Sequence, residues 1–162
     1  MTTEKGAPTE TSADSELVIT RVFDAPRELV FKVWTEPRHL AKWWGPHGFT
    51  TPECSLDLRP GGKLRIRMTG HGFDNVMDGE FVEIVEPERL VFKSFLRDET
   101  GAPYLEALTT VTFSEHAGKT TLRLIVRVVE SGPQAEGPLE GMSEGWNQSL
   151  ERLAAYVREG AR

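Results

Sequence analysis

The sequence predicts an α+β protein in which a curved antiparallel sheet of about six to seven strands wraps around a long C-terminal helix. Three observations predict this fold. Two short helical segments follow the first strand, segments of alternating apolar and polar residues then succeed one another without a helix, and the end of the chain repeats apolar residues at helical spacing. An antiparallel sheet has one apolar face to cover, so we expect the final helix to lie across it.

The first 15 residues are predicted to be a disordered polar tail. Apart from Met1 they contain no large aliphatic or aromatic residue, so ordering them would bury too little apolar surface to offset the entropy cost. They also lack the basic start and apolar centre of a signal peptide, so we expect a cytoplasmic protein. A single domain, residues 16–160, follows the tail, as the total length of 162 residues suggests.

The early part of this domain predicts one strand and two short helices. Residues 17–23 are rich in β-branched side chains and are expected to form a strand. Residues 24–28 combine an acidic cap candidate with an early proline, which indicates the start of a helix. Residues 35–37 repeat that signal, and Gly45-Pro46 ends the second helix.

Strands are predicted wherever apolar and polar residues alternate. The pattern is clearest in residues 63–68, whose basic residues Lys63, Arg65 and Arg67 are expected on the solvated outer face. Gly79 is a candidate β-bulge, which would reverse the facing of the residues after it. The remaining predicted strands are residues 81–85, 90–95, 108–113 and 121–129, with turns at 86–88 and 115–119.

The last predicted element is a long amphipathic helix. Its apolar stripe steps by three or four residues, as one face of a helix requires. Beside that stripe lies a row of small residues, Gly141, Gly145 and Ser149. A glycine inside a helix costs roughly 1 kcal/mol relative to alanine, so this row indicates either close approach to the sheet or space for a ligand. The apolar stripe consists of Leu139, Met142, Trp146, Leu150, Leu153 and Val157.

Composition and motifs exclude several classes of function. With 19 basic and 25 acidic residues the formal charge is −6, which argues against broad binding of nucleic acids or anionic membranes. The single cysteine, Cys54, allows no internal disulfide, and no apolar run is long enough to span a membrane. The four histidines show no metal-ligand spacing, and no phosphate loop, dinucleotide fingerprint or nucleophile elbow occurs. We therefore expect neither a metal nor a cofactor.

Five motifs in series resemble one known family over residues 16–160. They are Phe23-Asp24-Ala25-Pro26 with Val30, Phe31 and Trp34; Pro37 to Pro46 around Trp43-Trp44-Gly45; Asp57 to Gly62; Gly79 with Glu83 to Leu90; and Gly145-Trp146 with Leu150 and Leu153. The chain resembles the START-like (helix-grip, Bet v 1-like, SRPBCC) superfamily. Within it, the chain is similar to the family of the C-terminal domain of the activator of the 90-kDa heat-shock-protein ATPase.

The resemblance implies a helix-grip fold with a cavity between the sheet and the last helix, and three functions remain open. The first is binding of an apolar or amphipathic small molecule, lipid-like or polyketide-like, in that cavity. The second is an enzyme of the cyclase or dehydratase type that uses a cavity carboxylate as acid or base. The third is a chaperone-linked adaptor, which the family name suggests. The residues leave enzymatic activity undecided and favour its absence.

The residues expected to carry these functions also have plainer interpretations. Lining of the cavity is expected for Trp44, because of the resemblance, and for Met68, Met77, Phe95, Leu108, Met142 and Trp146, although ordinary core packing would explain the same residues. If the protein is an enzyme, the candidate acid–base residues are Glu80, Glu106 and His71, whose plainer interpretation is exposure on strands and loops.

Overall fold

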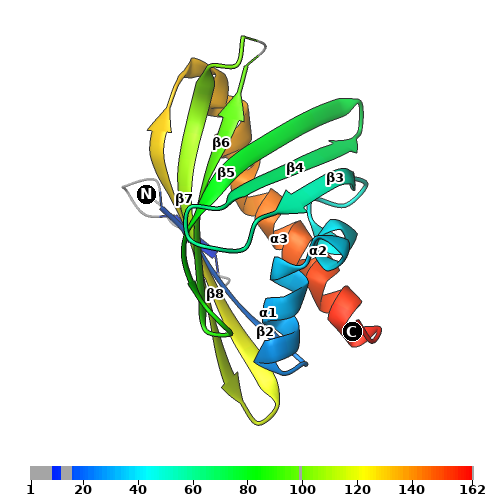
Figure 1. The fold of residues 1–162 in the computed structure, drawn as a ribbon. Helices are drawn as coiled ribbons and strands as arrows, with labels where there is room; N and C mark the ends of the chain where they lie inside the picture. The colour runs from blue at the N-terminus through cyan, green and yellow to red at the C-terminus, as the bar shows by residue number, and fades with distance from the viewer. Residues whose placement is uncertain (1–8, 12–15, 99, 162) are drawn as a thin grey trace.

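A computed structural model describes residues 9–11, 16–98 and 100–161, which form one sheet and three α-helices (Figure 1). The predicted α+β helix-grip fold is confirmed. The strands are β1 (Thr9–Thr11), β2 (Glu16–Phe23), β3 (Thr50–Leu56), β4 (Lys63–Gly70), β5 (Phe73–Val85), β6 (Arg89–Arg97), β7 (Pro103–His116) and β8 (Lys119–Ser131). The helices are α1 (Arg27–Thr35), α2 (Pro37–Trp43) and α3 (Glu136–Arg158), and a short 3-10 turn, η1 (Pro133–Ala135), precedes α3.

All strands pair antiparallel in the order β1-β2-β8-β7-β6-β5-β4-β3. Strands β3 to β8 are a meander of sequence neighbours, and β2 joins the far side next to β8. Strand β1 adds a short eighth strand beside β2, where the sequence predicts only a disordered tail. The other residues expected in that tail, 1–8 and 12–15, lie outside the described part of the chain.

Strand alternation separates an inner apolar face from an outer charged face. On β4, Leu64 and Ile66 are buried on the inner face. The three basic residues between and beside them pair with acids on the outer face, as the sequence predicts for that side. These ion pairs are Lys63–Glu80, Arg65–Glu53 and Arg67–Asp74.

Gly79 marks a close approach of strands, not the expected bulge. It pairs in regular register with Leu64 on one side and Ser94 on the other. The register irregularity of β5 falls later, between Phe81 and Glu83. A Cβ atom at Gly79 would lie 2.0 Å from the carbonyl oxygen of Lys93, so the neighbouring backbone leaves no space for a side chain.

The two short helices close one end of the sheet and pack beside the C-terminal end of α3 (Figure 1). Between α2 and α3, Nδ1 of the buried His39 lies 2.6 Å from the hydroxyl of Tyr156. All four tryptophans of the chain meet at this end. Trp34 stacks on Trp146 with ring centroids 5.9 Å apart, and Trp43 and Trp44 pack edge-on around them.

Helix α3 packs unevenly along its length. Leu150, Leu153 and Val157, in its C-terminal half, are buried in the core, whereas Met142 and Trp146 are only partly buried. The predicted apolar stripe therefore exists, but only its second half is fully enclosed. The first half of α3 stands over open space.

Two glycine substitutions should have opposite effects on stability. A Cβ at Gly141 would meet no atom within 4 Å, so Gly141→Ala should raise the free energy of unfolding by about 0.5–1 kcal/mol through helix propensity. Gly79→Ala should lower it by about 2–3 kcal/mol, because its methyl group collides with backbone. Urea denaturation of both variants measures the difference. A stabilised Gly79→Ala would contradict the close strand approach.

Candidate functional site

A pocket of about 340 Å³ lies between the inner face of the sheet and the N-terminal half of α3. This is near the small end of the roughly 300–1,000 Å³ range of small-molecule sites. The sheet supplies its floor from five strands, α3 supplies its roof, and the segment after α2 supplies one wall. The lining residues are Trp44, Gly45, Pro46, Ile66, Met68, Asn75, Met77, Phe92, Ser94, Leu96, Tyr104, Leu105, Ala107, Thr109, Val126, Gly141, Met142, Gly145, Trp146 and Ser149.

The lining is apolar with a few neutral polar groups. Among the described residues, none that lines the pocket carries a formal charge. The polar side chains are one amide, one phenol and three aliphatic hydroxyls: Asn75, Tyr104, Ser94, Thr109 and Ser149. Such a surface can bury hydrocarbon and donate or accept hydrogen bonds, but it offers no carboxylate or imidazole for general acid–base chemistry near neutral pH.

The helix glycines leave space, which decides between the two explanations of the small-residue row. At Gly141 a Cβ would meet nothing within 4 Å, and at Gly145 it would meet only Cγ of Pro46 at 3.8 Å. Neither glycine is needed for close approach to the sheet, and both line the pocket. Ser149, the third member of the row, also lines the pocket and is buried.

Five of the seven residues expected to line a cavity stand at this pocket. They are Trp44, Met68, Met77, Met142 and Trp146. Trp43, the last residue of α2, and Trp44, which follows it, point in different directions. Trp43 is fully buried and donates its indole N–H to the carbonyl oxygen of Val33 at 2.9 Å. Trp44 forms part of the pocket wall.

Phe95 and Leu108 lie on the other face of the sheet, which corrects the expectation for both. Phe95 is three residues from the pocket residue Phe92, and an odd separation along a regular strand places side chains on opposite faces. Leu108 is likewise three residues from Leu105. Phe95 instead packs under the guanidinium of Arg97, whose Cζ is 5.3 Å from the ring centroid.

None of the three candidate acid–base residues lines the pocket. Glu80 lies on the outer face, where Lys63 donates a hydrogen bond of 3.0 Å to it and lowers the pKa of its carboxyl. Glu106 occupies the outward position opposite Phe95. His71 is exposed in the turn between β4 and β5, with Nε2 3.1 Å from the carbonyl oxygen of His47. A cavity acid needs a place in the cavity, which none of these residues has, and the pKa of Glu80 is lowered where a cavity acid needs it raised.

Several pocket residues were not anticipated from the sequence, most of them on β5, β6 and β7. Their only signal is alternation: every second residue from Leu105 to Phe113 is buried. Alternation identifies an inner set but does not say which of its members face a cavity, because that depends on how far α3 stands from the sheet. The unanticipated residues include Asn75, Phe92, Ser94, Leu96, Tyr104, Leu105, Ala107, Thr109 and Val126.

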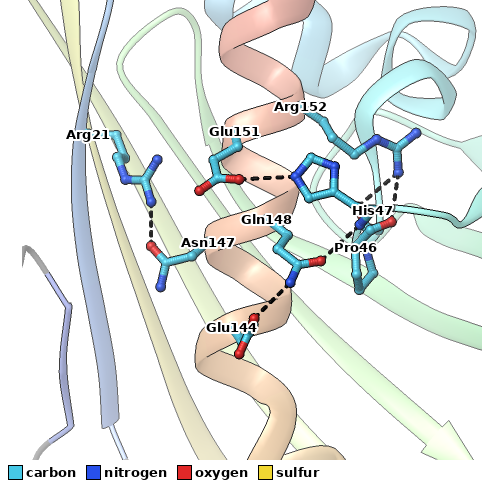
Figure 2. A network of polar contacts seen from close by, with 9 residues as sticks. Arg21, Pro46, His47, Glu144, Asn147, Gln148, Glu151 and Arg152 are labelled. Atoms are coloured by element: carbon cyan, nitrogen blue, oxygen red, sulfur yellow. Dashed lines mark hydrogen bonds and ion pairs between the residues drawn. The ribbon is translucent and has the colours of Figure 1, made fainter.

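Arg152 of α3 holds the wall segment, residues 44–46, against the helix through hydrogen bonds to its backbone (Figure 2). Its Nη1 donates to the carbonyl oxygens of Trp44, Gly45 and Pro46 at 3.0, 2.9 and 3.2 Å, and its Nη2 donates to that of Lys42 at 3.2 Å. Partial burial lowers the pKa of Arg152 from its usual value, yet a guanidinium remains charged at neutral pH. The charged guanidinium donates to backbone carbonyl oxygens, and Arg152 is not among the residues that line the pocket.

Further contacts from α3 hold the same segment and the opposite flank (Figure 2). The backbone N–H of His47 donates to Gln148, and its ring Nε2 lies 3.0 Å from Oε1 of Glu151. On the other side of the helix, Arg21 of β2 donates to the side-chain oxygen of Asn147. Helix α3 is therefore tied on both flanks, close to the end of the pocket that Trp146 and Ser149 line.

A second, much smaller hollow lies beneath the pocket and shares Trp44, Ile66 and Phe92 with it. Its volume of about 10 Å³ is close to the minimum that holds one water molecule. Trp34 also lines it, and the buried Nε1 of Trp34 has no hydrogen-bond partner among the described residues.

The described residues contain no cluster of three or more histidine, cysteine or acidic side chains that could hold a metal ion. No helix in the described part of the chain combines the length and hydropathy that a membrane crossing requires. Cys54 lies on β3, outside the pocket, and burial raises the pKa of its thiol to about 11. A thiol of that pKa is a poor nucleophile at neutral pH.

Removing the guanidinium of Arg152 should destabilise the protein. Arg152→Met keeps the aliphatic stem but leaves four carbonyl oxygens without their charged donor, so the free energy of unfolding should fall by about 1.5–3 kcal/mol. Arg59→Met, which removes a guanidinium 70% exposed beside Asp57, should change it by less than about 0.5 kcal/mol. Equal losses in the two variants would show that Arg152 holds nothing in place.

Alkylation should report the raised pKa of Cys54. Below pH 9 a shift from 9.0 to about 11 reduces the thiolate fraction, so iodoacetamide at pH 8 should react roughly 100-fold more slowly than with the urea-unfolded chain. The rate should rise about ten-fold per pH unit until the pH approaches 11. A native rate equal to the unfolded rate at pH 8 would contradict the burial of this thiol. Mass spectrometry of the adduct measures both rates.

Comparison with known proteins agrees with this architecture. Residues 24–158 match the family model described as Activator of Hsp90 ATPase homolog 1-like protein. No curated protein matches the chain.

Solved structures with the same fold cover nearly the whole chain. Protein Ms6760 from Mycobacterium smegmatis is 27% identical with a TM-score of 0.80, over 93% of this chain and 96% of its own. A protein from Arthrobacter aurescens is 27% identical with a TM-score of 0.81, over 95% and 92%. The AHSA1 protein from Silicibacter pomeroyi is 25% identical with a TM-score of 0.74, over 90% and 99%. The resemblance to the START-like superfamily is thus confirmed, and the chain belongs to the Activator of Hsp90 ATPase homolog 1-like family.

Proposed function

We propose that the protein binds a small apolar molecule in the pocket between the sheet and helix α3. The observation that carries this proposal is the chemistry of the pocket: about 340 Å³ lined by apolar and neutral polar groups, with no charged side chain among the described lining residues. Two helix glycines keep the space open at a cost in helix stability, and neither is needed for packing. Loss of stability without a packing reason is typical of a functional site.

Affinity would come mainly from buried hydrocarbon. At roughly 25 cal/mol per Å², a ligand that buries about 300 Å² gains roughly 7 kcal/mol before association costs are subtracted. Met68, Met77 and Met142 line the pocket, and methionine side chains adapt to ligands of different shapes. We therefore expect binding that is modest in strength and tolerant of ligand shape.

The pocket chemistry favours binding over catalysis. Cyclisation or dehydration by a cavity acid would need a carboxylate or histidine at the ligand, and Glu80, Glu106 and His71 all stand elsewhere. The chaperone-linked adaptor rests on the family description alone, without a surface feature that favours it. Small-molecule binding is thus the function with direct physical support.

The proposal can be tested with N-phenyl-1-naphthylamine, an uncharged apolar dye that fluoresces on leaving water. The wild-type protein should bind it with saturation, and the fluorescence of Trp44 and Trp146 should change because both line the pocket. Gly145→Leu should weaken binding at least about ten-fold, because a leucine there adds side-chain volume at the pocket.

Glu140→Leu is the matched control, since Glu140 is exposed on the same helix and does not line the pocket. It should bind the dye as the wild type does. Absence of saturable binding to the wild type would remove the proposed function. Equal loss in both leucine variants would place the dye elsewhere on α3.

A further inference from the structure

Thr109 places a hydroxyl on the pocket floor. It lies on β7 between Phe92 of β6 and Val126 of β8, its direct neighbours across the two strand pairs, and all three residues line the pocket. The residue is 2% exposed, and its hydroxyl makes no hydrogen bond to any described residue. The hydroxyl oxygen is not among the described buried side-chain atoms that lack a partner, so it is open to the pocket that Thr109 lines. A valine of the same shape would fill this position without that unpaired polar group.

Ser149 places a second hydroxyl on the roof. It is 5% exposed, and its Oγ accepts a hydrogen bond of 3.1 Å from the backbone N–H of Gly45. A serine hydroxyl can accept and donate at the same time. The hydroxyl hydrogen of Ser149 has no acceptor among the described residues, so one donor remains unused in the pocket roof.

Each of these hydroxyls has a hydrogen that it can donate to a ligand in the pocket. A ligand that displaces water from such a hydroxyl without replacing its hydrogen bond loses free energy. Resting on the proposed function, we propose that Thr109 and Ser149 select a ligand that carries a neutral oxygen acceptor, a ketone, ester or similar carbonyl, on an otherwise apolar body. The carbonyl oxygen accepts from a lining hydroxyl, and the rest of the ligand contacts the apolar lining.

The charge of the lining decides against ionised ligands. A carboxylate or an ammonium group in this pocket would meet no described side chain of opposite charge. The guanidinium of Arg152 on α3 does not line the pocket and donates to four backbone carbonyl oxygens. An ion would therefore lose its hydration without a charged partner, whereas a carbonyl group exchanges its water for a hydroxyl donor of the lining.

The test compares 1-tetralone with tetralin, two bicyclic molecules of which only the first has a carbonyl group, each measured by displacement of N-phenyl-1-naphthylamine. Thr109→Val should weaken binding of 1-tetralone by about five- to ten-fold, the loss expected for one neutral hydrogen bond. Tetralin binding should be unchanged. Ser149→Ala should show the same selectivity, although it also removes the acceptor for Gly45.

Thr110→Val is the matched control, because Thr110 is the next residue of β7 and does not line the pocket. It should change binding of neither molecule. Thr109→Val should keep the far-UV circular dichroism spectrum and the cooperative thermal unfolding of the wild type, because valine has nearly the same shape, and this shows that the variant is folded.

The outcomes separate this inference from the function on which it rests. A loss confined to 1-tetralone in either pocket variant supports it. If the wild type binds the dye but neither variant distinguishes 1-tetralone from tetralin, selection by the hydroxyls is overturned and apolar binding stands. If the wild type binds no dye, both proposals fall together.

Discussion

The structure depends on how helix α3 meets the concave face of the sheet. Its C-terminal half is pressed into the core through Leu150, Leu153 and Val157. Its N-terminal half carries Gly141 and Gly145, at which an added Cβ atom would meet almost nothing. A helix of 23 residues is a rod about 35 Å long, so both halves share one orientation. The angle set by packing at one end therefore determines the height of the pocket at the other.

That angle is held by contacts that mix ring packing with backbone hydrogen bonds. Trp44 shows the combination, because its ring packs against Trp146 while its carbonyl oxygen accepts from Arg152. The wall segment cannot move away from α3 without breaking both. On the other flank, the bond from Arg21 to Asn147 limits rotation of the helix toward β2. The pocket is thus preformed by interactions outside it, which lowers the ordering cost of binding.

Local patterns predicted the elements of this fold well and the facing of its side chains less well. The period of the last helix and the proline at Pro37 are local signals, and α2 and α3 agree with them. The facing of Phe95 and Leu108 depends on strand register, which shifts near Phe81, Leu96 and Glu106. No single segment of sequence contains such a register. The ion pair of Glu80 with Lys63 joins two strands, so it depends on register in the same way.

Selectivity for a ligand must come from lining residues that do not also pack in the core. Trp44, Ile66 and Phe92 line both the pocket and the hollow beneath it, so their replacement would cost stability as well as binding. Thr109 differs, because its hydroxyl can be removed without changing side-chain shape. In the sequence, Thr109 looks like any other β-branched residue of a strand. Only its place on the pocket floor, with a hydroxyl that is open to the pocket and makes no hydrogen bond to a described residue, distinguishes it from a structural residue.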